Sequence, residues 1–401
     1  WKRKSMKIFE EKLPEYNVIG TDEINQALKV LKQGQLSGFI ATAGNSHLGG
    51  KHVRKLEELF CNKFNSKFSA SFNSATSALH AALISCGLNK NDEVLVPTMS
   101  MSASATSILM AGGKPVFVDI ESDYFCIDTD KIYQSITKKT KGIITVNLFG
   151  MPSDLKKIRK ICDEFNLFMI EDNAQAPAAK YEKQFTGTFG DISVYSLNRH
   201  KTIQCGEGGI ATTNEKQFIH KLRLVRNHSE AVYDGLTSEE KSLGGENIIG
   251  YNYRLTCLQA AVAIPQIKKL DRLNEKRVVL ASELNKKLLD IDFLEAPKVR
   301  ENTSHVYYLY PMIFNPTKAK ISKEKFLKNM LEEGAPISEY APPIYTMSLF
   351  KKCIQGVNIA KKFPVTEFLS KHLLVTSICR PPLTKKHIDK FYKAILKSSK
   401  E

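Results

Sequence analysis

The stretch Val194–Asn214, VYSLNRHKTIQCGEGGIATTN, holds a single lysine, Lys201, between a β-favouring segment and a glycine cluster. The cluster, Gly206–Gly209, lets the backbone turn tightly or approach a ligand closely. A lysine that is partly desolvated in such a turn loses its proton more easily and becomes a nucleophile for Schiff-base chemistry. The alternative is a solvated surface lysine beside an ordinary turn, since most lysines are exposed.

Outward from this stretch, short apolar runs alternate with helical patterns. We expect strands at Ser69–Phe72, Glu93–Pro97, Val116–Ile120, Gly142–Leu148, Leu167–Ile170, Ile192–Ser196 and Gly209–Thr213. Such alternation favours an α/β fold with a mainly parallel sheet that is covered on both faces.

The remaining pattern is mostly helical. We expect helices from Thr21 and at Lys51–Phe64, Phe218–Arg226, Lys323–Leu331 and Lys385–Lys397, with a strand-like run at His305–Phe314. Residues Leu255–Asp290 are strongly helical, with an expected break near Pro265. Two polar, glycine-bearing segments, Gln33–Gly50 and Asn227–Gly250, are predicted to be loops.

This pattern divides the chain into three parts. Residues 1–20 form an N-terminal arm, residues 21–265 a large domain, and residues 266–401 a smaller C-terminal α+β domain. A chain of 401 residues can bury a large core in each of two domains.

The formal net charge of +16 raises the question of nucleic-acid binding. The lysines are spread over helix-like faces and chain ends, and no basic run is interleaved with aromatic residues. We therefore expect a solvated basic surface that attracts anionic substrates, with no nucleic-acid partner.

The eight cysteines are scattered, without a CxxC pair or zinc-finger spacing. This pattern predicts free thiols in a reducing compartment and no metal site. The charged N-terminus has no apolar core of a signal peptide, and no apolar run is long enough to cross a bilayer. We expect a cytoplasmic protein with no membrane partner.

Two further segments could bind a ligand. Asn73–Ser77 follows a strand and opens a helix, so its free N–H groups suit a phosphate, although Asn, Ser and Thr are also ordinary helix caps. Asp172 follows a buried strand at the edge where α/β folds place ligands, but a carboxylate there can also simply begin a turn.

Four motifs occur in one order: NSATSAL at 73–79, EDNAQAP at 171–177, SLNRHK at 196–201 followed by GEGG at 206–209, and GYNYRLT at 250–256. Together they resemble the DegT/DnrJ/StrS sugar aminotransferases, which depend on pyridoxal 5′-phosphate (PLP). The resemblance extends from about Gly38 to Lys269 and continues more weakly to the C-terminus. It implies the fold type I architecture of aspartate aminotransferase, and a homodimer with active sites shared between the subunits.

The resemblance assigns roles around the cofactor ring to three residues. Lys201 matches the lysine that forms the Schiff base and later moves the proton. Asp172 matches the aspartate that pairs with the pyridinium nitrogen and makes the ring an electron sink. Gln175 matches a residue on the side of the ring hydroxyl.

The cofactor phosphate is assigned in the same way. Ser196, five residues before Lys201, matches a phosphate ligand, and Ala75 with Thr76 matches the phosphate-cradling turn. Asn252 matches a residue that reaches the phosphate of the neighbouring subunit.

Three positions bear on how far the resemblance extends. Met101 stands where the family commonly stacks an aromatic residue on the cofactor, although its polarizable sulfur can also lie over a ring. Tyr345 stands where a histidine is often found. Some relatives replace the lysine by histidine and dehydrate the sugar, and His200 is adjacent, but counting from Ser196 favours Lys201.

The resemblance therefore predicts a PLP-dependent aminotransferase that moves an amino group from L-glutamate to a keto group of a nucleotide-linked sugar. Gly38–Gly50 and Asn227–Gly250 are the candidate substrate loops. One alternative is a PLP-dependent sugar dehydratase of the same fold. Another is a regulatory protein on this scaffold, against which the presence of Lys201, Asp172 and Ser196 argues.

Overall fold

The computed structural model describes residues 7–400, and within them the large domain is built on a seven-stranded sheet. In spatial order its strands are β1 (Phe68–Phe72), β9 (Gly209–Thr213), β8 (Ile192–Ser196), β5 (Phe168–Asp172), β4 (Thr140–Val146), β2 (Glu93–Pro97) and β3 (Lys114–Val118). Strands β8, β5, β4, β2 and β3 pair in parallel, and β9 is antiparallel to both of its neighbours. The expected α/β fold with a mainly parallel sheet is confirmed.

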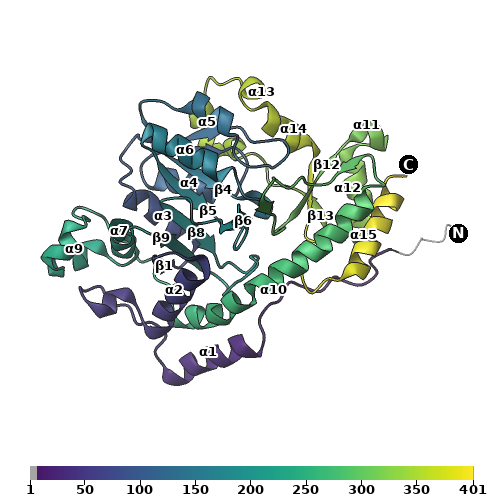
Figure 1. Ribbon diagram of the computed structural model, residues 1–401. Helices are drawn as coiled ribbons and strands as arrows, with labels where there is room; N and C mark the ends of the chain where they lie inside the picture. Colours follow the sequence, from purple (N-terminus) through teal and green to yellow (C-terminus); the bar gives the residue numbers. More distant parts are fainter. Residues whose placement is uncertain (1–6, 401) are drawn as a thin grey trace.

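Helices cover both faces of this sheet (Figure 1). They are α2 (Lys51–Phe64), α3 (Ala75–Ser85), α4 (Ala103–Met110), α5 (Thr129–Ser135), α6 (Leu155–Phe165) and α7 (Lys216–Arg226). Successive side chains of a strand point to opposite faces. Accordingly Val94 and Val96 of β2 pack in the core with α3, α4 and α7, whereas Leu95 packs with α6. Every residue of β2, β8 and β9 is buried, as expected for central strands between two helical layers.

One long helix, α10 (Cys257–Leu288), links the large domain to the small one (Figure 1). Thr256 caps its start, and the side chain of Gln259 completes a capping box. The helix runs through Pro265 without the expected break, so that expectation was wrong. A proline removes one backbone hydrogen bond, and here it is buried where α10 packs against α1 (Thr21–Gln33) and α2.

The small domain carries a four-stranded antiparallel sheet within the described residues, in the order β10–β12–β14–β13. The strands are β10 (Leu294–Glu295), β12 (Tyr310–Phe314), β14 (Leu373–Thr376) and β13 (Ile337–Glu339). Their apolar residues pack against the C-terminal half of α10, α12 (Lys323–Glu332) and α15 (Lys385–Ser398).

Short elements complete the fold. They are β6 (Lys180–Tyr181), β7 (Gln184–Phe185), β11 (Thr303–Ser304), α11 (Pro316–Ala319), α13 (Ile359–Lys362), α14 (Pro364–His372), η2 (Leu148–Gly150), η4 (Ile344–Thr346) and η5 (Ser348–Ile354). No helix in residues 7–400 is both long and apolar enough to cross a membrane.

The two predicted loops are partly helical. Residues 227–250 contain α8 (Ser229–Val232), η3 (Tyr233–Gly235) and α9 (Ser238–Ser242). Thr237 and Glu240 form a capping box that stabilises α9 in a segment with little apolar periodicity. Residues 33–50 contain the single turn η1 (Asn45–Leu48).

Two segments join the domains. In the N-terminal arm, Phe9 is buried in the small-domain core, and its N–H donates to Glu333 O (3.0 Å). Further along the chain, Ile344 packs in the core of the large sheet, and its N–H donates to Thr98 O (2.8 Å). Asp119, which follows β3, accepts hydrogen bonds from the N–H groups of Val365 and Thr366 at the start of α14.

Candidate active site

The candidate site lies where the central strands end. Asp172 is the last residue of β5 and is paired with Val146 of β4 and Val194 of β8. Ser196 lies two residues beyond Val194, at the end of β8. Because the carboxyl ends of parallel strands meet at one edge of a sheet, the fold brings Asp172 and Ser196 to the same edge.

Asp172 is buried and held by two donors. Ser104 Oγ, from α4, donates to Oδ2 (2.9 Å), and the N–H of Ala174 donates to Oδ1 (3.0 Å). Burial raises the pKa of the Asp172 carboxyl, while these hydrogen bonds and the charge of Lys201 lower it. Each carboxylate oxygen retains a further acceptor position, so the group can still bind a cationic N–H.

Lys201 lies in the turn between β8 and β9, as the sequence predicts. Its N–H donates to Asn198 O (2.9 Å), and the turn is closed by the bond from Leu197 N–H to Gly208 O (2.8 Å). The side chain is partly buried, and Nζ lies 4.6 Å from the centroid of the Tyr308 ring. The neighbouring His200 is exposed and is not among the groups that shift the pKa of Asp172.

A tight backbone contact joins the sheet to the start of α3. Gly209 is paired with Phe72 on one side and with Ser196 on the other. A Cβ at Gly209 would lie 2.4 Å from Ser74 O and 2.6 Å from the N of Ala75. Glycine is therefore required here, and its absent side chain lets the N-terminus of α3 lie beside Ser196.

This contact creates a set of hydrogen-bond donors. Ser74 caps α3 by accepting from the N–H of Ser77 (3.1 Å). The N–H groups of Ala75 and Thr76, the first two of the helix, have no intrahelical acceptor, and the positive end of the helix dipole adds to their pull on an anion. Together with the Ser196 hydroxyl, they form a donor set that suits a phosphate.

Gln175 is buried next to this edge. Its Oε1 accepts from the N–H of Phe149 (2.9 Å). The ring of Phe149 contacts Tyr340 of the small domain edge-on, with centroids 4.8 Å apart. Gln175 therefore lies where the two domains meet.

Among the described residues, three positions considered in the sequence analysis form no hydrogen bond to Asp172, Lys201 or Ser196. Met101 is 62% exposed in the single chain, one turn before Ser104. Asn252 is also exposed, and its Oδ1 accepts from Arg254 Nε (2.7 Å). Tyr345 is buried in the large-domain core, where its hydroxyl donates to Glu367 (2.6 Å).

Sequence reasoning missed Ser104, Tyr308 and Tyr340. Ser104 stands in a run of small residues, ASATS, that carries no signal for a carboxylate partner. The two tyrosines come from the small domain and reach the site through the tertiary fold. A run of aromatic residues, Tyr307–Tyr310, was the available signal for Tyr308, although such runs are usually core.

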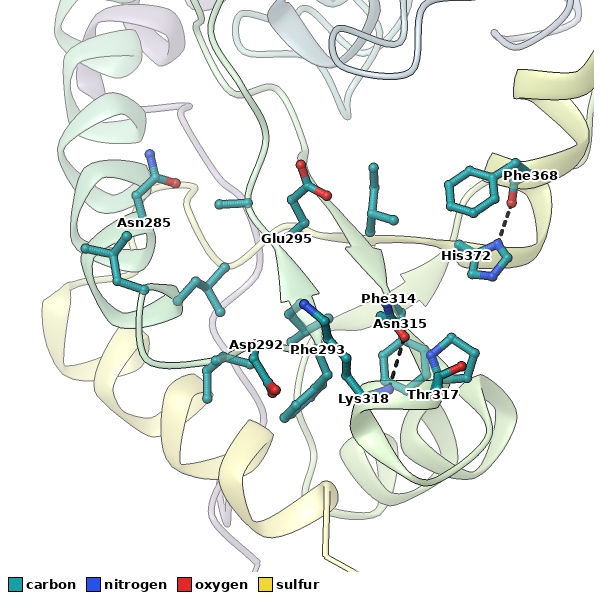
Figure 2. Close-up of a pocket in the computed structure, with 17 residues that line it drawn as sticks. Asn285, Asp292, Phe293, Glu295, Phe314, Asn315, Thr317, Lys318, Phe368 and His372 are labelled. Atoms are coloured by element: carbon teal, nitrogen blue, oxygen red, sulfur yellow. Dashed lines mark hydrogen bonds between the residues drawn. The ribbon is translucent and has the colours of Figure 1, made fainter.

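A well-formed cavity lies elsewhere (Figure 2). It has a volume of about 590 Å3 and lies between the end of α10, β10 and α11. Two of its polar side chains have local partners: Asn315 caps α11, and His372 bonds to Phe368 O (2.7 Å). None of the predicted site residues lines it, and we place the chemistry at the strand ends instead.

The residues at the strand ends fit PLP. The donor set of Ala75, Thr76 and Ser196 suits its phosphate, and the carboxylate of Asp172 suits its ring nitrogen. Among residues 7–400, no group of three or more His, Cys, Asp or Glu side chains is placed to hold a metal ion.

Comparison with known proteins identifies the family of the chain. The model of the DegT/DnrJ/EryC1/StrS aminotransferase family matches residues 28–396. GDP-perosamine synthase of Escherichia coli O157:H7 is 30% identical over 312 residues, which cover 78% of this chain and 82% of that protein.

Solved structures show the same architecture. An aminotransferase from Psychrobacter cryohalolentis superimposes with a TM-score of 0.85 at 25% identity, over 95% of this chain and 97% of that one. The Escherichia coli GDP-4-keto-6-deoxy-D-mannose-3-dehydratase superimposes with a TM-score of 0.82 at 22% identity, over 96% and 99% of the two chains. The expected fold type I architecture is confirmed.

Proposed function

The chain belongs to the DegT/DnrJ/EryC1/StrS aminotransferase family of PLP-dependent enzymes, and from this premise we propose that it aminates a keto group of a nucleotide-linked sugar. The amino donor in this proposal is L-glutamate. The name of GDP-perosamine synthase, a relative at 30% identity, supports a nucleotide-linked sugar as the acceptor.

One observation carries the choice of transamination over dehydration. A lysine, Lys201, is partly buried in the turn after β8; its Nζ lies 4.6 Å from the centroid of the Tyr308 ring, and its charge lowers the pKa of the buried Asp172. His200 is mostly exposed; partial desolvation and the positive charges of Arg199, Lys201 and Arg380 lower its pKa. A lysine amine can both form a Schiff base and carry a proton, which transamination requires of one group.

Asp172 tunes the reaction. Bound PLP supplies a ring that accepts electrons from the α-carbon of the donor. With PLP bound, the Asp172 carboxylate would keep a proton on the ring nitrogen, because burial strengthens the interaction between opposite charges. Ser104 and Ala174 fix the carboxylate, so it need not reorient during turnover.

Lys201 moves the proton. With PLP bound, Nζ would carry the proton from the donor α-carbon to the C4′ carbon of the cofactor, and in the second half of the reaction it would carry a proton from C4′ to the sugar carbon that receives the amine. The π face of Tyr308 attracts the ammonium form and holds Nζ near one position between these transfers. The donors of Ala75, Thr76 and Ser196 anchor the phosphate.

The exposed position of Asn252 supports a shared site. Its side chain is exposed in the single chain, as expected for a group that serves the other subunit of a homodimer. The candidate substrate loops, Gly38–Gly50 and Asn227–Gly250, meet where Asn227 Nδ2 donates to Ile40 O (3.1 Å).

The test is a product assay with purified, PLP-loaded protein. L-Glutamate and a panel of nucleotide-linked keto sugars should yield 2-oxoglutarate and an amino sugar in equal amounts, and Lys201→Ala should yield neither. A deoxygenated sugar with no amine incorporated would establish the dehydratase instead. Absence of turnover with every pair of substrates, in protein that holds PLP, would favour a regulatory role.

A further inference from the structure

Two guanidinium groups lie beside the Lys201 turn, and neither is paired with a carboxylate of the described residues. Arg277, on α10, is fully buried, and Arg380, four residues after β14, is partly exposed. In the part of the chain that the structure describes, neither forms an ion pair, and the buried Nε of each has no hydrogen-bond partner. Burying a cation without a counter-ion costs free energy, so this pair of arginines lacks an anion that would neutralise it.

Tyr16 of the N-terminal arm holds the two arginines in place. The guanidinium carbon of Arg277 lies 5.2 Å from the centroid of its ring, and that of Arg380 lies 5.8 Å away. The Tyr16 hydroxyl donates to Thr202 O (2.5 Å), immediately after Lys201. The arginines are thereby fixed against the backbone of the turn that carries the proposed Schiff-base lysine.

Arg277 also contacts the backbone of Tyr308, whose ring lies beside Lys201. Its Nη1 donates to Tyr307 O (3.3 Å) and Tyr308 O (3.2 Å). These bonds occupy one nitrogen of Arg277. The guanidinium of Arg380 has no hydrogen bond to any described residue, so its donors are free for a ligand.

The surrounding charges leave Arg380 uncompensated. Glu15, whose charge raises the pKa of Arg380, is exposed and paired with Lys12 (3.2 Å). Burial and the like charge of Arg277 lower the pKa of Arg380, yet a guanidinium remains charged at neutral pH. The groups on the turn itself, Arg199 to Lys201, add positive charge.

We propose that Arg380 binds the α-carboxylate of the amino donor, with Tyr16 and Arg277 as positioning residues. The proposal rests on the proposed function, because it takes the donor to be an amino acid. Its α-carboxylate is attached to the carbon that gives its proton to Lys201, so the anion site belongs beside that lysine. The diphosphate of a sugar nucleotide is separated from the reacting carbon by the sugar ring and belongs further away.

Binding of an unreactive dicarboxylate tests the proposed carboxylate site without turnover. Glutarate, a dicarboxylate with no amine, is titrated calorimetrically into PLP-loaded wild type and variants. Removal of a charged hydrogen-bond partner should weaken binding by about 10- to 100-fold in Arg380→Gln, and by less in Arg380→Lys, which keeps the charge but loses the forked geometry. Arg272→Gln, at an exposed position on α10, is the matched control and should bind as wild type.

Kinetics and a second ligand show whether Arg380 binds the carboxylate of the donor or the diphosphate of the sugar nucleotide. Arg380→Gln should raise KM for L-glutamate with little change in KM for the keto sugar, and Tyr16→Phe should show a smaller change in the same direction. Glutarate binding that is absent in wild type, or unchanged in Arg380→Gln, would overturn the proposal. So would weaker binding of UDP or GDP in Arg380→Gln with glutarate unaffected. Arg380-dependent glutarate binding in a protein that fails to aminate sugars would leave the carboxylate site in place and reject the proposed reaction.

Discussion

Replacement of Gly209 by alanine tests the link between the sheet and the phosphate donors. The new Cβ would lie 2.4 Å from Ser74 O and 2.6 Å from the N of Ala75. Both contacts are with backbone, so no side chain can rotate away and the N-terminus of α3 must shift. Overpacking of this kind costs about 1–3 kcal/mol, and we expect the upper end because backbone must move.

Two measurements report the effect. A loss of about 3 kcal/mol corresponds to a fall in Tm of about 6–12 °C for a domain of about 150–250 residues, measured by circular dichroism on the PLP-free protein. Displacement of the Ala75 and Thr76 N–H groups should also weaken PLP binding at least about 10-fold, since hydrogen bonds to charged groups contribute about 1.5–3 kcal/mol.

The control is Gly20→Ala at the start of α1. A Cβ there would meet its nearest atoms at 3.6 Å, and the φ of −136° is allowed for alanine. We expect its stability to fall by no more than about 1 kcal/mol, with PLP affinity unchanged. A Gly209→Ala protein with the Tm and PLP affinity of wild type would refute the reasoning.

Three further predictions concern the site itself. Asp172→Asn should keep the fold but lower kcat/KM about 100-fold or more, because removal of one partner of a buried charge pair costs about 3–5 kcal/mol; unchanged turnover would contradict the assignment. Ser104→Ala should lower kcat/KM about 10-fold, through loss of one bond to the Asp172 carboxylate, whereas equal losses in Ser104→Ala and Asp172→Asn would show that Ser104 has another role. Co-expressed Lys201→Ala and Asn252→Ala chains should regain activity towards half of wild type per heterodimer, since one of the two shared sites is then intact; activity no higher than that of the parents would place Asn252 in its own subunit's site.

The central elements could be predicted because local signals agreed with the tertiary fold. The expected strands Glu93–Pro97, Ile192–Ser196 and Gly209–Thr213 and the helix Lys51–Phe64 coincide with the structure residue by residue. The strands are indicated by short apolar runs that end at glycine, proline or polar residues. The helix is indicated by apolar residues that recur along one face. Asp172 is placed by the same logic, at the end of a buried strand.

Other features depend on contacts that sequence patterns do not encode. Pro265 predicts a break, but packing of α10 against α1 and α2 keeps the helix continuous. The approach of Tyr16 to Thr202 joins residues 186 positions apart. Tyr345 was aligned with a family histidine, yet its ring is part of the large-domain core, and this burial follows from the return of the chain onto the large sheet.

The most direct test of the central claim is reduction of the PLP-loaded protein with borohydride, followed by peptide mapping. If Lys201 holds the cofactor, one peptide, containing Lys201, should carry the reduced label, and the absorbance of the linkage should disappear on reduction. Lys201→Ala should carry no label, while His200→Asn should keep it. A label on a different lysine, or a protein that binds PLP without any reducible linkage, would contradict the account.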